Sequence, residues 1–123
     1  MTKNMNDRYL YRAKRTDNGE WITWNILTGI PHDAGIFGDT VCACTGLKDK
    51  NDKLIWENDI MVAHLDDSFP EDTTYARVVW NNNGFCTKEQ GSNDISPLDK
   101  FDQEYFEVCG NLFDTPELLE VGE

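Results

Sequence analysis

Hydrophobic and polar residues alternate along most of this chain, with the period of two that is typical of half-buried β-strands. Two such runs, residues 8–14 and 20–27, lie on either side of a turn at residues 16–19. The turn contains Asn18 followed by Gly19, a pair that accepts positive φ at low cost. The pattern therefore predicts an antiparallel hairpin. The side of its second strand that we expect to face the core consists of Ile22, Trp24 and Ile26.

The rest of the chain continues as short strands separated by turns and loops. Residues 28–39 are rich in glycine and turn formers, and they predict a loop. An Asn-Asn-Gly turn at residues 82–84 predicts a second hairpin. The further strands are expected at residues 40–45, 54–56, 59–65, 75–80, 85–88 and 105–113.

Two polar segments are expected to lie on the surface. Residues 66–74 predict an acidic loop, and residues 89–103 a polar, mobile segment in which Pro97 argues against a central strand. Helix signals are nearly absent. Only residues 115–120 predict a helical turn, with Thr115 as its cap and Pro116 at its first position. Short strands with almost no helix predict a small barrel or rolled sheet.

Length and composition fit one domain built around one core. The chain has 123 residues, of which 39% are hydrophobic and 11% aromatic. A chain of this size buries roughly two thirds of its unfolded surface. The bulk of the sequence is therefore expected to fold as a single domain over residues 1–123.

Charge is distributed unevenly along the chain. Residues 1–53 carry 7 acids and 8 bases, a net charge of +1, whereas residues 54–123 carry 16 acids and 3 bases, a net charge of −13. The acidic part should repel nucleic acid and anionic membranes. Only the basic amino-terminal edge, with Arg12, Lys14 and Arg15, could attract nucleic acid, and five basic residues there make a weak site.

The sequence predicts a cytoplasmic protein without a membrane partner. No apolar run approaches the roughly 18 residues that a membrane span needs, and the first fourteen residues lack the apolar region of a secretory signal. Cysteines in this setting are expected to be free thiols. The four cysteines are Cys42, Cys44, Cys86 and Cys109.

The candidate metal and catalytic residues lack the spacing that their chemistry needs. A four-thiolate zinc site usually contains two tight cysteine pairs, but only Cys42 and Cys44 form a pair, with one intervening residue. We expect the cysteines to be buried apolar fillers. The sequence alone does not identify a catalytic partner for His32 or His64. The acids of residues 66–72 lack the alternating spacing and central glycine of a calcium loop. No cofactor is expected.

Four blocks of sequence together resemble the YopX family, small proteins carried by bacteriophages and prophages with no established biochemical activity. The second block reads TGLKDKNDKLIWENDI and begins at Thr45, and the last reads FEVCGNLFDTPELLE and begins at Phe106. The others are residues 11–22, reading YRAKRTDNGEWI, and VVW at residues 78–80 with Gly84 and Phe85. Their order and spacing follow the family pattern over nearly the whole chain.

The resemblance implies a mainly β fold with a roll like the Src-homology-3 barrel from about residue 45 onward. Residues 1–44, with the first hairpin, would then form a layer that packs against this core. Where the family usually has glycine, this chain has Asp52 and Asn58. Both residue types tolerate left-handed backbone, so we expect the two turns to be preserved.

The family setting and the lack of a catalytic constellation favour a non-enzymatic interaction module that binds a host or phage protein. Two alternatives are an acidic mimic of a polyanion, which occupies a basic site on a host protein, and weak nucleic-acid binding through the amino-terminal edge. The sequence is also compatible with a homo-oligomer. Most tryptophans are expected in the core. The candidate binding surface consists of Trp56, Trp80, Tyr75, Arg12, Lys14 and Arg15.

Overall fold

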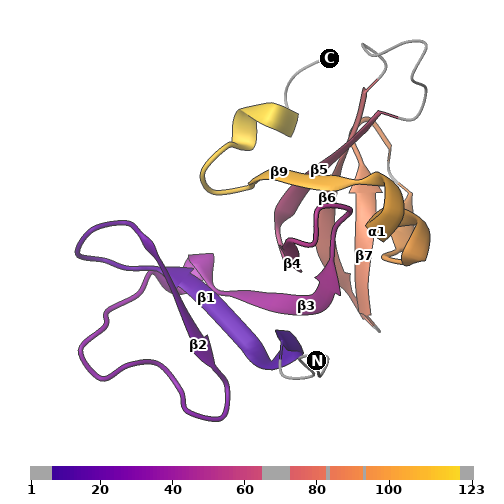
Figure 1. Cartoon of the computed structure of the whole chain (residues 1–123). Helices are drawn as coiled ribbons and strands as arrows, with labels where there is room; N and C mark the ends of the chain where they lie inside the picture. Colours follow the sequence, from indigo (N-terminus) through magenta and orange to yellow (C-terminus); the bar gives the residue numbers. More distant parts are fainter. Residues whose placement is uncertain (1–6, 65–72, 83, 93, 120–123) are drawn as a thin grey trace.

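The computed structural model describes residues 7–64, 73–82, 84–92 and 94–119, which form two antiparallel sheets (Figure 1). The first sheet has four strands in the order β2-β1-β3-β4. Short 3₁₀ turns η1 (Asp7–Tyr9) and η2 (Gly38–Thr40) precede β1 and β3. The strands of this sheet are β1 (Leu10–Lys14), β2 (Trp21–Asn25), β3 (Cys42–Lys48) and β4 (Leu54–Trp56).

The second sheet has five strands in the order β8-β7-β6-β5-β9. A short helix, α1 (Lys100–Tyr105), connects β8 to β9, and the 3₁₀ turn η3 (Pro116–Leu119) follows β9. The strands are β5 (Asp59–His64), β6 (Thr73–Asn81), β7 (Gly84–Glu89), β8 (Ile95–Pro97) and β9 (Glu107–Asn111).

The mainly β architecture and the amino-terminal hairpin confirm the sequence predictions. Strands β1 and β2 pair in antiparallel register, with Arg12 opposite Thr23. The predicted barrel is not closed: in the part of the chain that the structure describes, both sheets end in free edges. The boundary expected between residues 44 and 45 falls inside β3, and residues 66–72 of the predicted acidic loop lie outside the described residues.

The apolar core lies on the second sheet and on β4. Leu47 of β3 and Val108 of β9 also pack against it. The buried residues of this cluster are Ile55, Met61, Ala63, Ala76, Val78 and Phe106. Strand β5 is buried at five consecutive positions, which explains why its apolar run is nearly continuous instead of alternating.

Two details of the sequence interpretation are wrong. The expected core side of β2 is not buried as a unit, because Ile26 lies beyond the strand end and is 52% exposed. The Trp21 on the opposite side instead packs edge-on against Phe113. The Thr115 hydroxyl also does not cap η3, since it accepts a hydrogen bond from the Asn111 amide and donates to the Asn111 carbonyl.

The polar segment at residues 89–103 contains ordered structure that the sequence analysis missed. It forms β8 and α1, and Pro97 is tolerated because β8 is an edge strand. A reciprocal pair of hydrogen bonds begins α1: Asp99 accepts from the Asp102 amide, and Asp102 accepts from the Asp99 amide.

The two turn residues at which the resemblance implies glycine adopt left-handed backbone, as predicted. Asp52 has φ of 68° and Asn58 has φ of 72°. The Asn58 turn joins β4 of the first sheet to β5 of the second. The turn is fixed in place because the Asn58 amide donates to the Val78 carbonyl and the Asn58 carbonyl accepts from the Leu112 amide. This turn fixes the position of Glu57 and Asp59 on either side of it.

Candidate functional site

A groove of about 550 Å³ opens between the two sheets. The first sheet contributes residues of β1 and β3, and the second contributes residues of β6 and β7. We call it the inter-sheet groove. Its lining consists of Arg8, Tyr11, Ala43, Cys44, Thr45, Glu57, Trp80 and Phe85.

Trp80 and Phe85 form the aromatic wall of the inter-sheet groove. They are cross-strand partners in the β6–β7 hairpin, and their rings meet edge to face with centroids 5.0 Å apart. Trp80 is nevertheless 55% exposed. A large aromatic side chain that is exposed beside a hollow is a common anchor in protein interfaces.

The opposite wall of the inter-sheet groove is formed by β1 and β3, which pair through their main chains. Tyr11 lies across from Ala43 in the β1–β3 pair, and the ring of Trp24 stacks on Tyr11 at 6.3 Å between centroids. Glu57 contributes a carboxylate to this wall. Its Oε1 accepts from the Ala43 amide at 3.3 Å, while its own amide donates to the Ala43 carbonyl at 2.9 Å.

Arg8 lies in η1 at the rim of the inter-sheet groove. Its guanidinium donates to the Tyr9 hydroxyl and lies over the Tyr9 ring, 5.1 Å from the centroid. Close packing of η1 on β3 fixes this position, since a Cβ on Gly46 would lie 3.0 Å from the Arg8 Cβ. Gly46 also has φ of +81°, a conformation that favours glycine.

A second cluster, centred on Arg12, links the sheets. Arg12 of β1 donates from Nη2 to Oδ1 of Asp59 in β5 at 2.8 Å. The guanidinium lies between two indoles, 4.3 Å from the Trp21 ring centroid and 4.8 Å from that of Trp56. Asp59 also accepts a hydrogen bond from the Trp56 amide at 2.7 Å. This cluster joins the sheets with polar and cation–π contacts.

Burial dominates the titration of Asp59. The side chain is 2% exposed, and this desolvation raises its pKa to about 6, although the Trp56 amide and Arg12 both favour the charged form. Asp59 is therefore a carboxylate that changes charge near neutral pH inside the contact between the sheets.

The other two basic candidates of the amino-terminal edge also face carboxylates. Lys14 pairs with Asp114, which accepts further hydrogen bonds from the Trp21 indole and the Asn111 amide group. Although desolvation opposes it, hydrogen bonds from these groups lower the pKa of Asp114 to about 2. Arg15 donates to both carboxylate oxygens of Asp17, at 2.9 and 2.8 Å.

The structure brings only one of the six candidate binding residues, Trp80, into the inter-sheet groove. Trp56 is 8% exposed and packs on Arg12, and Tyr75 is half-buried in β6. Phe85 and Glu57 also line the groove, although neither was expected there from the sequence. The register of the β6–β7 hairpin places Phe85 opposite Trp80, so the position of Phe85 could have been predicted from the Asn-Asn-Gly turn. Glu57 lines the groove only because the two sheets pack together there, and no local sequence pattern predicts this packing.

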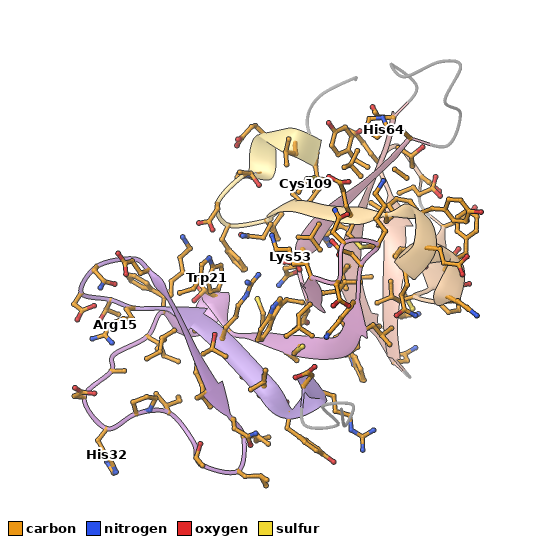
Figure 2. All side chains as sticks on the ribbon, in the orientation of Figure 1. Arg15, Trp21, His32, Lys53, His64 and Cys109 are labelled. Atoms are coloured by element: carbon orange, nitrogen blue, oxygen red, sulfur yellow. The ribbon has the colours of Figure 1, made fainter. Side chains whose placement is uncertain are left out.

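The cysteines and histidines form no common site among the described residues. Cys42 and Cys44 are buried in β3, where desolvation raises the pKa of both thiols. Cys86 is buried on β7, but Cys109 is exposed, so the expectation that all four are buried is wrong for Cys109. His32 and His64 lie at opposite ends of the molecule (Figure 2).

A second hollow, of about 440 Å³, lies beside β7, β8 and α1 and is acidic. Desolvation raises the pKa of Asp102 within it to about 6. We call it the acidic hollow. Its carboxylates come from Glu89, Asp94, Asp99 and Asp102.

None of the helices in the described part of the chain has the length and apolar character that a membrane span needs.

Comparisons with known proteins agree with this architecture. The sequence matches the family model described as YopX protein over residues 2–120. The structure is similar to the crystal structure of protein EF1440 from Enterococcus faecalis, with a TM-score of 0.55, 21% identity, and coverage of 89% of this chain and 96% of that one. At this identity the likeness supports the fold alone. No curated protein matches the sequence. Since the family match extends over almost the whole chain, this protein belongs to the YopX family.

Proposed function

We propose that this protein is a non-enzymatic interaction module that binds a segment of a partner protein in the inter-sheet groove. The observation that carries the proposal is Trp80, which is 55% exposed at the mouth of a groove of about 550 Å³. Small β folds often recognise extended segments through aromatic grooves. We place the interaction in the bacterial cytoplasm, with a host or phage protein as the partner.

The chemistry of the groove favours a segment that combines an arginine or lysine with apolar residues. The Glu57 carboxylate lies in the same groove as Trp80, and the whole chain has a net charge of −12. Arginine stacks on indole rings and pairs with carboxylates, so both groups suit one cationic side chain. The acidic surface would also speed the approach of a basic partner.

The groove residues that could act as nucleophiles are engaged or disfavoured as reacting groups. The Thr45 hydroxyl donates to the Ile55 carbonyl at 2.8 Å. Desolvation raises the pKa of the Cys44 thiol, which disfavours the reactive thiolate. These contacts support a binding role for the groove over a catalytic one.

The test is capture of partners from lysate of induced host cells with the wild-type protein and with Trp80→Ala as baits. A partner that uses the groove should lose at least roughly tenfold in affinity, because truncating an aromatic hot spot costs about 2 kcal/mol or more. Tyr105→Ala is the matched control, since Tyr105 is 48% exposed and lies outside the groove lining.

Glu57→Gln separates the charge contribution from the shape of the groove. We expect it to weaken binding of a basic segment while leaving the fold intact, because Gln can still accept from the Ala43 amide. A partner that binds the wild type and Trp80→Ala equally would contradict the groove as the binding site.

The acidic hollow favours a second candidate function, the imitation of a polyanion. Four carboxylates surround that hollow, and residues 54–123 carry a net charge of −13. This function predicts binding to a basic host site that weakens steeply with salt and is insensitive to Trp80→Ala. The nucleic-acid alternative is less favoured, because Arg12, Lys14 and Arg15 each pair with a carboxylate.

A further inference from the structure

The four sheet edges formed by the described strands differ in how they are protected against pairing with another chain. Strand β4 has three residues, and β8 has three residues including Pro97. Strand β9 carries Glu107 and a register shift, and η3 packs beside it. Short edges, proline, charge and irregular register are the devices by which proteins block edge pairing.

Strand β2 has none of these devices. Its five residues read Trp-Ile-Thr-Trp-Asn, with no charge, no proline and no glycine. It forms a regular five-residue register with β1, and its other side is an edge of the sheet. An uncharged, aromatic-rich edge of this length is a template for a further strand.

The register shows which main-chain groups of β2 point outward. The Ile26 amide donates to the Tyr9 carbonyl, and the Arg15 amide donates to the Glu20 carbonyl. Because hydrogen-bonded positions alternate along an antiparallel strand, the even-numbered residues of β2 bond to β1. The main-chain groups of Trp21, Thr23 and Asn25 therefore point away from the sheet. The Thr23 side chain is also exposed.

We propose that a second copy of this chain pairs with this edge, antiparallel, about a two-fold axis through Thr23. Each Thr23 would donate its amide to the Thr23 carbonyl of the other copy. Each Asn25 amide would donate to the Trp21 carbonyl of the other copy. The two bonds between the Thr23 residues and the two from Asn25 to Trp21 give four main-chain hydrogen bonds in all. Two four-stranded sheets would then become one continuous sheet of eight strands.

Exposed apolar side chains extend the proposed contact. Ile26 is 52% exposed and Leu27 is 81% exposed, directly after β2. Both residues belong to the turn that follows Asn25, so in a register centred on Thr23 they would lie near the start of β2 in the other copy. Further exposed apolar residues of the following segment are Ile30 and Phe37. Burial of this cluster would add a hydrophobic contribution to the main-chain pairing.

Charge favours a second copy along this edge over any other face. Residues 1–53 have a net charge of +1, while residues 54–123 have a net charge of −13. Strand β2 lies on the side of the first sheet away from the second sheet (Figure 1). Pairing along β2 therefore keeps the two acidic sheets apart, which reduces their mutual repulsion. The proposal is independent of the inter-sheet groove.

The experiment measures molar mass by light scattering and sedimentation over a range of concentrations. We expect the wild-type mass to rise from 14.1 kDa toward twice that value. Thr23→Lys and Thr23→Glu should each remain monomeric, because a two-fold axis places like charges opposite each other. An equimolar mixture of the two variants should recover the dimer. Ser96→Lys, on the edge strand β8, is the matched control and should dimerise like the wild type.

Two results would overturn the proposal. A wild-type mass that stays at 14.1 kDa up to millimolar concentration would exclude self-pairing. Dimers of Thr23→Lys alone, as strong as those of the wild type, would place the contact elsewhere. Trp80→Ala should remain dimeric, so loss of partner binding in that variant and loss of self-association are separable outcomes.

Discussion

The two sheets of this protein are stabilised by different interactions. The second sheet, with β4, carries the apolar cluster around Met61 and Val78, and both side chains are fully buried. Outside β4, the strands of the first sheet bury only the small side chains of Ala13, Cys42 and Cys44. It is attached largely through Arg12, which reaches Asp59 and lies between two indoles.

This difference shows that the acidic sheet supplies the core and that the near-neutral sheet depends on it. Strands β1, β2 and β3 have no large side chain that is fully buried, so they gain little from the hydrophobic effect. Its position is defined instead by directional contacts, which are lost when one partner is removed. The inter-sheet groove lies along this junction, so the shape of the groove depends on the same contacts.

The largest expected effect comes from Arg12→Ala, which leaves Asp59 buried without its cation. Removal of one partner of a buried ion pair typically costs about 3–5 kcal/mol. We expect amides of β1 and β2 to exchange much faster while those of β5 and β6 remain protected. Hydrogen exchange with a urea unfolding curve measures both effects.

The double variant Arg12→Met with Asp59→Asn is the control for this prediction. It removes both charges and keeps a long side chain between the indoles, so it should recover part of the lost free energy of unfolding. Equal loss of amide protection in both sheets of Arg12→Ala would show that the two sheets unfold as one unit, which would contradict a first sheet that depends on the Arg12 contacts.

Met61→Ala truncates a core side chain of the second sheet and should destabilise both sheets together. Met61 is fully buried, and truncation of such a side chain typically costs about 2–5 kcal/mol. Amides of β1 and β2 should lose protection together with those of β5. Tyr105→Ala is the control, because Tyr105 is 48% exposed and lies outside the core cluster, so the substitution should change the unfolding free energy far less. If only the amides of β1 and β2 lost protection in Met61→Ala while those of β5 stayed protected, this expectation would be contradicted.

The pH dependence of stability probes the Asp59 contact without changing its volume. The folded pKa of about 6 lies above the ordinary value of 3.8, so this group favours folding fully below pH 3.8. That contribution is lost as the pH rises through about 6. The free energy of unfolding of the wild type should therefore fall, relative to Asp59→Asn, between pH 4 and pH 6.

Urea unfolding of both proteins across this range measures the change. The comparison with Asp59→Asn is needed because Asp102 also has its pKa raised to about 6 and contributes in the same direction in both proteins. A difference that grows with pH in the opposite sense would show that the attraction of Arg12 outweighs the desolvation of Asp59.

The smallest expected effect comes from Gly46→Ala, compared with Gly19→Ala. Both glycines have positive φ, so each substitution should cost about 1 kcal/mol of backbone strain. Only the Cβ at Gly46 meets a neighbour, the Arg8 Cβ at 3.0 Å, whereas the Cβ at Gly19 meets open space. Gly46→Ala should therefore destabilise the protein more and also weaken binding in the groove. Equal thermal midpoints for the two variants would contradict close packing of η1 on β3.

Local signals in the sequence were sufficient for most of the fold. Alternation and Asn-Gly turns identified both hairpins. The left-handed conformations of Asp52 and Asn58 were expected from the resemblance, which implies glycine at both positions, together with residue types that tolerate this backbone. Helix α1 was missed although Asp99 and Asp102 have the spacing of a capping pair, because the segment around them is polar and lacks clear hydrophobic periodicity. Strand β8 was missed because it is short and exposed.

The candidate site depends on contacts between residues that are far apart in the chain. Arg12 and Asp59 are 47 positions apart, and Lys14 and Asp114 are 100 apart. Nothing local distinguishes a basic residue that pairs with a buried carboxylate from one that faces solvent. The amino-terminal edge therefore looked available for nucleic acid, whereas the fold places Asp59 beside Arg12 and Asp114 beside Lys14; only the Arg15–Asp17 pair is local.

The unequal environments of the four indoles also give the protein an internal optical reporter. Trp80 is 55% exposed, whereas Trp56 is 8% exposed, and Trp21 and Trp24 are half-buried. A neutral quencher such as acrylamide should reach Trp80 first, and the unquenched emission that remains should come mostly from the shielded indoles and lie at shorter wavelength. Fluorescence can thus follow occupancy of the groove and integrity of the junction as two separate signals, without any added label.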